Sequence, residues 1–263
     1  MRPLERAQRP ARIRPTAAAA VLRELGLMFA AILAYFAIRG ISEGSIDAAH
    51  ANAERLLEFE QRLGIDWEAA VQGWIIGSHA LVTLANWVYI WGHWPFIALV
   101  AVWLVRWHPA EYRAIRNAFL VSGSIGLVIF ATFPVAPPRL FDTGVVDTVT
   151  QYSRAYRVLQ PPALVNQYAA MPSFHFGWNL LIGLGIIRCS RHPGWRALGA
   201  GAPLAMGLAT VATANHYVLD LVAGAAIALA ALYAVELARG RRAAPWQPAV
   251  WLRPFEPGTA DVR

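Results

Sequence analysis

Six long apolar stretches, separated by short polar connections, constrain this chain more than any other feature. They cover residues 24–38, 79–105, 118–133, 173–187, 195–214 and 217–237. A helix needs about 20 mostly apolar residues to cross the hydrocarbon core of a bilayer. The shorter stretches suit helices whose ends meet polar loops inside a bundle. The sequence therefore predicts an all-α integral membrane protein, a six-transmembrane-helix bundle.

Composition excludes several other classes of protein. Hydrophobic residues make up 57% of the chain and charged residues 15%, whereas a soluble domain carries roughly a quarter charged residues. The single cysteine, Cys189, cannot form an internal disulfide, which excludes a disulfide-stapled secreted domain. The net charge is +7, but the basic residues form short clusters between the apolar stretches. A nucleic-acid partner, which needs a basic face, is therefore not expected.

Arginine clusters predict the orientation of the six helices, because basic residues are retained on the cytoplasmic side. The chain contains no lysine. Arginines cluster in residues 2–14, 106–116, 188–196 and 239–242, all on one side of six crossings. We therefore expect cytoplasmic tails at 1–23 and 239–263, a membrane domain at 24–238 and an extracytoplasmic active site. The arginine-only basic set and the absence of an Asn-X-Ser/Thr sequon suit a bacterium with a GC-rich genome. The expected location is therefore the plasma membrane, as a bacterial inner membrane.

The connection between the first two stretches contains an amphipathic pattern. Apolar residues recur among charges at near-helical spacing over 48–63. This pattern predicts an amphipathic helix on the outer surface, within an outer segment of about 46–76. A plain solvated loop is the alternative.

Three short polar clusters lie at the outer ends of the predicted spans. The first, residues 133–139, contains three prolines that stiffen the backbone before Arg139. The second, residues 171–175, places Ser173 and His175 at a helix start, where free backbone N–H groups favour anions. The third, residues 214–220, places His216 and Asp220 four residues apart and so on one helix face. Ionisable groups at such positions are functional candidates.

Together the three clusters indicate phosphoryl transfer. Arg139 and Ser173 are the candidate phosphate-binding residues, and Asp220 is expected to orient His216 as a nucleophile. His175 is then the candidate general acid. Several alternatives remain. Ser173 could be a helix cap or a nucleophile, and His216 and Asp220 a structural pair. His175 and Arg139 could face lipid headgroups, and the two histidines with Asp220 could bind a metal. The phosphohistidine interpretation requires neither a metal nor another cofactor.

A possible substrate pocket follows from further polar residues. One face of the second stretch carries polar side chains at helical spacing, although hydrogen bonding between helices would also explain them. At 1.5 Å per residue, His93 would lie about 21 Å below His79, which is too deep for the same site. The candidate pocket residues are Asn86, Tyr89, Asn166, Asn215 and Tyr217.

These clusters resemble the type-2 phosphatidic acid phosphatase superfamily, most closely its inositol phosphorylceramide synthase-like (inositolphosphotransferase) branch. The resemblance covers about residues 64–237, with three specific segments. The matching residues are Pro134, Ala136, Pro137, Pro138 and Arg139; Asn166, Tyr168, Ala169, Ala170, Met171, Pro172, Ser173 and His175; and Ala214, Asn215, His216, Tyr217 and Asp220. The resemblance implies a six-helix bundle, His216 as nucleophile, His175 as acid and Arg139 as phosphate ligand.

The chain also departs from the family pattern. Thr132 stands where the family has a lysine, and Ala209 and Thr210 stand where it has a serine–arginine pair. Either Arg154 or Arg157 completes the phosphate site, or the substrate carries less charge, as a phosphodiester does.

The expected function is therefore that of a membrane lipid phosphatase or phosphotransferase. Its substrate would be a lipid phosphate or phosphodiester, and the acceptor water or an inositol- or sugar-like alcohol. Membrane lipids are the expected surroundings. The alternatives are a lipid-phosphate transporter or flippase that binds headgroups without catalysis, and a membrane scaffold.

Overall fold

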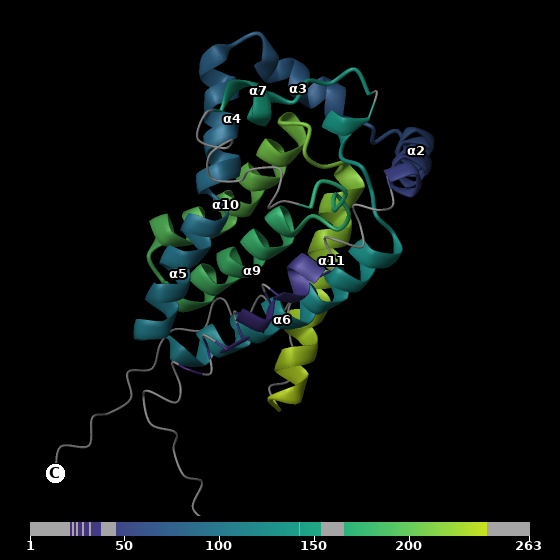
Figure 1. Cartoon of the computed structure of the whole chain (residues 1–263). Helices are drawn as coiled ribbons and strands as arrows, with labels where there is room; N and C mark the ends of the chain where they lie inside the picture. Colours follow the sequence, from purple (N-terminus) through teal and green to yellow (C-terminus); the bar gives the residue numbers. More distant parts are fainter. Residues whose placement is uncertain are drawn as a thin grey trace, which may run out of the picture.

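The computed structural model describes residues 46–141, 143–153 and 166–240, and also 22, 24, 26, 27, 29–31 and 33–37. Within these ranges the fold is all-helical, apart from an isolated bridge between Val135 and Ala169. The bundle consists of α4 (His79–Trp91), α5 (Trp94–Trp107), α6 (Pro109–Thr132), α9 (Phe174–Cys189), α10 (Pro193–Ala212) and α11 (Val218–Ala238). Four shorter or outer elements are α2 (Ile46–Leu63), α3 (Glu68–Ile76), η1 (Pro138–Leu140) and α7 (Thr148–Tyr152) (Figure 1).

The helices that are long and apolar enough to cross a membrane are fewer than the six predicted spans. Among the described residues, α6 and α11 qualify, and α4 with α5 qualify as one bent span. The prediction of a single helix over 79–105 is wrong, because the chain breaks after Trp91 and bends by 45°. α9 is a shorter apolar helix of 16 residues. The tails at 1–21 and 241–263 lie outside the described residues, as do parts of the first predicted span.

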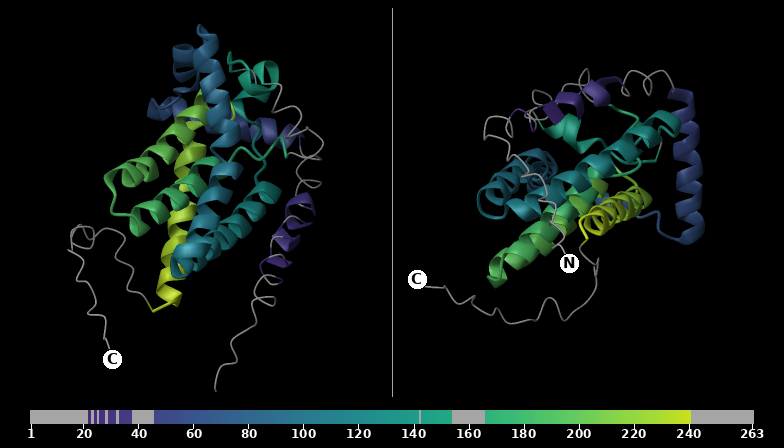
Figure 2. Two further views of the ribbon diagram at one scale, coloured as in Figure 1. Left: turned by 90° about the vertical axis from the view of Figure 1, so that its left-hand side faces the viewer. Right: turned by 90° about the horizontal axis from the view of Figure 1, so that it is seen from below.

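α9 occupies the centre of the bundle, with α10, α11 and α6 packed around it (Figures 1 and 2). Its Leu181 and Ile182 are almost completely buried against Leu104 of α5 and Ala228 of α11. Fully burying an aliphatic side chain of this size contributes roughly 1.5–3 kcal/mol. This central position holds the first turn of α9 against the start of α11.

Glycines bring the backbones of α9 and α11 into direct contact. A Cβ added to Gly224 would lie 2.1 Å from the carbonyl oxygen of Ser173, and one added to Gly177 would lie 2.5 Å from that of Gly224. The backbone N–H of Ser173 also donates to the carbonyl of Asp220, at 2.8 Å. Small residues permit such close helix packing in membrane proteins. The contact brings the second and third polar clusters together.

The helix expected at 48–63 is α2, which lies beside the bundle and crosswise to α11 (Figure 2). Its inner face buries Ala49, Ala53 and Leu56. These residues form one apolar cluster with Tyr217, which precedes α11, and with residues of the loops at 135–136 and 170. The contact therefore ties α2 to both polar loops that flank the bundle.

The close contact between α9 and α11 predicts that Gly224→Ala is destabilising. The added methyl group would overlap the Ser173 backbone, which cannot rotate away, so we expect a loss of about 1–3 kcal/mol. Thermal unfolding in detergent measures this as a lower Tm. The matched control is Gly201→Ala in α10, where an added Cβ meets no atom within 4 Å and the Tm should not fall. Equal Tm values for the two variants would contradict the role of this contact.

Candidate active site

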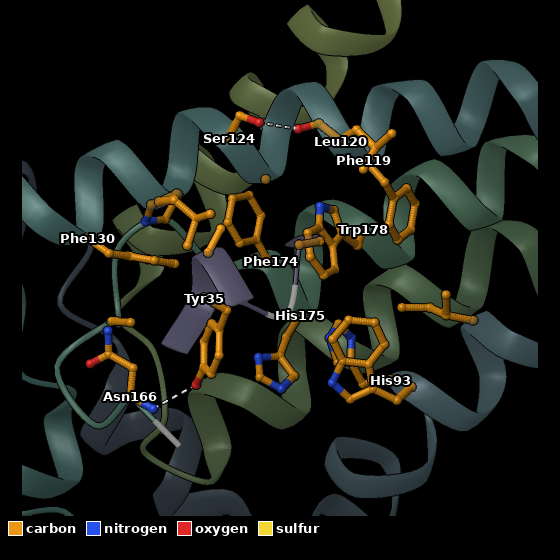
Figure 3. A pocket seen from close by; sticks show the side chains of 18 of the residues that line it. Tyr35, His93, Phe119, Leu120, Ser124, Phe130, Asn166, Phe174, His175 and Trp178 are labelled. Carbon is orange, nitrogen blue, oxygen red and sulfur yellow. Dashed lines mark hydrogen bonds between the residues drawn. The ribbon is translucent and has the colours of Figure 1, made fainter. Parts of the chain in front are cut away.

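A cavity of about 1070 Å³ lies among α4, α5, α6, α9 and the N-terminal helical residues. His175, His216 and Arg139 line one end of it, together with Asn166 and Asn215. Figure 3 shows His175 and His93 side by side in the cavity, with Asn166 bound to Tyr35. The structure therefore brings residues from all three polar clusters to one cavity.

A tight turn between α10 and α11 presents His216. α10 ends at Ala212, and Ala214 adopts a left-handed conformation with φ of 58°. The backbone N–H groups of Asn215 and His216 both donate to the carbonyl of Thr210, at 2.9 and 3.2 Å. Because this turn closes on α10 itself, the His216 backbone is fixed before α11 begins.

The hydrogen bonds of His216 define its tautomer. Its Nδ1 lies 2.8 Å from the carbonyl oxygen of Ala170 and 3.2 Å from Oδ2 of Asp220. The Ala170 carbonyl can only accept a hydrogen bond, so the hydrogen lies on Nδ1. Nε2 then carries no hydrogen and faces the cavity, which is the requirement for a nucleophilic imidazole.

His175 lies in the first turn of α9 and faces His216. Its Nδ1 is 3.4 Å from Nε2 of His216, and the two ring centroids are 5.5 Å apart. Since Nε2 of His216 carries no hydrogen, Nδ1 of His175 is the donor in this contact. Tyr89 stacks on the other side of the His175 ring, at 4.6 Å between centroids. The donor hydrogen of His175 therefore points toward the atom that would attack phosphorus.

The electrostatic environment of His216 favours the neutral ring. Burial lowers the pKa of His216 from 6.5 to about 3, and the positive charge of Arg139 acts in the same direction. The hydrogen bond to Ala170 raises the pKa and offsets a part of this effect. The imidazole is therefore unprotonated over the whole ordinary pH range.

Arg139 is held rigidly at the same end of the cavity. It lies in η1, and its backbone N–H donates to the carbonyl of Ala214 at 3.0 Å. Its Nη1 donates to Oδ1 of Asn215 at 2.6 Å, and its Nε lies 3.6 Å from Oδ2 of Asp147. These contacts orient the guanidinium but leave it in the cavity lining, where it could bind an anion.

Four of the expected site residues do not line the cavity: Asp220, which contacts His216 from behind, and three residues with other roles. Ser173 is fully buried and caps α9, its hydroxyl accepting from Phe176 N at 3.4 Å. Asn86 exchanges hydrogen bonds with Thr148 and thereby joins α4 to α7. Tyr217 is fully buried in the apolar cluster beneath α2. The structure thus gives these three residues contacts that hold elements together.

His93 corrects an expectation made from the sequence. Its ring lies 4.2 Å from that of His175, so it belongs to the same site. Asn179 donates to the carbonyl of His175 at 2.8 Å, and its amide also lies 3.4 Å from Nδ1 of His93. The depth argument failed because the site lies at the break between α4 and α5, about one helix length from His79. The glycine before His93 was the available signal of that break.

The positions where the family pattern has further cations carry no positive charge in this chain. Thr132 is exposed and bonds its own helix, and Thr210 is buried and does the same. Neither replaces a missing cation. Arg154 and Arg157 lie outside the described residues. Among the described residues that line the histidine end of the cavity, Arg139 is the cation.

The fold and the cavity define a helical membrane protein whose histidines, arginine and aspartate gather at one end of an apolar cavity. Comparison with protein families extends this description. The family model described as "PAP2 superfamily" matches residues 54–234, which is more than half of the chain. The chain belongs to the PAP2 superfamily, whose members are generally phosphoesterases. Neither the curated proteins nor the solved structures that were compared gave a match.

The low pKa of His216 predicts that this residue does not titrate near neutral pH. Because the folded-state pKa lies below 6.5, the neutral ring persists as the pH falls to about 4. NMR of protein with ¹⁵N-labelled histidine, assigned with His216→Gln, should show a constant Nδ1–H tautomer from pH 8 to 5. Exposed His79 serves as the internal control for the assignment of the spectra. A His216 midpoint near 6.5 would contradict the assignment.

Proposed function

We propose that this protein cleaves a lipid phosphoester through a phosphohistidine formed on His216. The observation that carries the proposal is the contact between Nε2 of His216 and Nδ1 of His175, at 3.4 Å inside an apolar cavity. Membership of the PAP2 superfamily supports phosphatase-type activity on a lipid phosphoester.

In the first step, Nε2 of His216 attacks phosphorus. The N–P bond forms while the bond from phosphorus to the leaving oxygen breaks. His175 acts as the imidazolium: it donates its Nδ1 proton to that oxygen and becomes neutral. Asp220 stabilises the positive charge that develops on the His216 ring through its contact with Nδ1. Arg139 binds the non-bridging phosphate oxygens.

In the second step, an acceptor hydroxyl attacks the phosphohistidine. The new O–P bond forms, the N–P bond breaks, and the acceptor proton moves to His175. Water as acceptor gives a phosphatase, and an alcohol gives a phosphotransferase. The same two histidines serve both steps, so the identity of the acceptor depends on which hydroxyl compound the cavity admits.

The shape of the cavity supports a lipid substrate. It extends along α6 from Phe130, near the histidines, to Tyr112, which corresponds to about 27 Å of helix. This length is close to the roughly 30 Å of a hydrocarbon core. Apolar residues of α5, α6, α9 and the N-terminal helical segment line most of it, and Arg116 pairs with Glu24 at the far end. An acyl or isoprenoid chain would fit this lining, with its phosphate at the histidine end.

The charge of the site favours a phosphodiester and an alcohol acceptor, as in the inositolphosphotransferase-like branch. Arg139 supplies the positive charge at the histidine end of the described cavity lining, and Asp147 lies 3.6 Å from it. A phosphomonoester dianion would be poorly neutralised here, whereas a phosphodiester carries one negative charge. We propose that both termini are cytoplasmic and that the site opens on the extracytoplasmic side of a bacterial inner membrane.

The nucleophile assignment predicts the behaviour of three variants. With a ³²P-labelled lipid phosphoester, His216→Ala should form no phosphoprotein, because the attacking nitrogen is absent. His175→Gln should slow phosphoprotein formation by about 10²–10⁴-fold, the usual contribution of a general acid. His79→Ala is the control, since this exposed residue of α4 does not line the cavity. Labelling of His216→Ala at the wild-type level would refute the assignment.

The charge argument predicts the substrate preference. In matched detergent micelles, kcat/KM should be higher for a lipid phosphodiester than for phosphatidate, and added inositol or sugar should yield a phosphorylated alcohol. Phosphatidate as the better substrate, with water as acceptor, would indicate a simple lipid phosphatase. Lipid translocation in liposomes without bond cleavage would instead support the flippase alternative.

A further inference from the structure

The first turn of α11 is capped by three buried acidic side chains. The backbone N–H groups at the N-terminus of a helix have no hydrogen-bond partner within that helix. Here three consecutive ones each donate to an acidic side chain: Tyr217 to Asp220 at 2.9 Å, Val218 to Glu68 at 2.9 Å, and Leu219 to Glu60 at 2.6 Å. Negative charge at a helix N-terminus is also favoured by the helix dipole.

Two of the three carboxylates come from outside the bundle. Glu60 lies in the last turns of α2, and Glu68 is the first residue of α3. Both are buried, with exposed fractions of 0% and 4%. Glutamate is almost never fully buried without partners. The outer segment therefore meets α11 through specific polar contacts as well as through the apolar face of α2.

The surroundings of the two glutamates favour a protonated Glu60. As a carboxylate, Glu60 would leave its Oε2 without a donor among the described residues. As a carboxylic acid, it donates a hydrogen bond to Glu68. Burial, together with the nearby charge of Glu68, raises the pKa of Glu60 to about 9, which favours the acid form at neutral pH. The pair thus accepts two backbone N–H groups without carrying two full negative charges.

The side chain of Asp220 makes two interactions that compete for the same oxygen. Its Oδ2 accepts from the backbone of Tyr217 and also lies 3.2 Å from Nδ1 of His216. Without Glu60 and Glu68, the N–H groups of Val218 and Leu219 would have no acceptor, and Asp220 is the adjacent carboxylate. An unpaired buried donor costs about 1–3 kcal/mol, so these N–H groups would draw Asp220 away from the imidazole.

We infer that Glu60 and Glu68 are positioning residues for His216. Glu68 and Glu60 accept the hydrogen bonds of the Val218 and Leu219 N–H groups. Asp220 then remains bound to the imidazole of His216 and fixes the orientation of that ring toward phosphorus. The inference rests on the proposed function, because it takes His216 as the nucleophile. It makes the outer segment α2–α3 a part of the active-site framework.

The experiment compares phosphoprotein formation and KM for variants of the full-length protein in detergent. Glu60→Ala and Glu68→Ala should each lower the rate by about 10²-fold, the usual cost of a 1 Å misplacement, with KM unchanged. Glu60→Gln keeps the acceptor oxygen and can donate to Glu68, so it should restore a near-wild-type rate. The control, Glu54→Ala, alters the exposed face of α2 and should have no effect.

Wild-type rates in both alanine variants would overturn the inference, and so would an inactive Glu60→Gln. If the alanine variants do not fold, Glu60→Asp and Glu60→Gln decide instead. The shorter aspartate cannot reach Leu219 and should be slow, while glutamine should be fast; the reverse order would overturn the inference.

A second readout separates the two proposals. The ¹⁵N chemical shift of His216 Nδ1 reports its hydrogen bond to Asp220 whether or not the protein is active. Glu60→Asp should change this shift, and Glu60→Gln should not. If wild-type protein forms no phosphoprotein, the proposed function fails, and the shift alone then tests the positioning role. An unchanged shift in Glu60→Asp would refute that role even in an active enzyme.

Discussion

The site depends first on the direct backbone contact between α9 and α11. Ser173 begins one helix and Asp220 lies in the first turn of the other, and their backbones are joined by a 2.8 Å hydrogen bond. Gly224 permits this approach, because any side chain there would meet the Ser173 carbonyl. His175 follows Ser173 and His216 precedes Asp220, so their rings can meet only if the two helix starts are held this close. The relative position of the two histidines thus depends on the close packing of α9 and α11 that glycine permits.

A second constraint is the need to give every buried polar group a partner. The Nδ1 of His216 faces Asp220 and Ala170, and the amide of Asn179 lies between His93 and His175. Each contact assigns a hydrogen to one nitrogen, which leaves Nε2 of His216 unprotonated at the cavity. Burial acts in the same sense by lowering the pKa of His216. The arrangement therefore presents a neutral nucleophile without any rearrangement of protons.

Sequence reasoning predicted the all-α class and brought Arg139, His175 and His216 to one site, because helical periodicity and motif order report local geometry. It did not predict the break before His93, since an apolar run of that length also fits one continuous span. The burial of Glu60 and Glu68 was equally hidden. From the sequence, both residues are expected to be solvated charges of the outer segment. Their hydrogen-bond partners at the start of α11 lie 159 and 150 residues away in the chain. Such long-range pairing leaves no periodic signal.

The identity of the phosphorylated nitrogen tests the central claim most directly. The phosphoprotein can be trapped by rapid denaturation in base, where phosphohistidine survives, and its ³¹P and ¹⁵N spectra identify the bonded atom. The hydrogen-bond pattern predicts phosphorus on Nε2 of His216, because Nδ1 is held by Asp220 and Ala170. Phosphorus on Nδ1 of His216, on His175 or on Ser173 would contradict this account of the site.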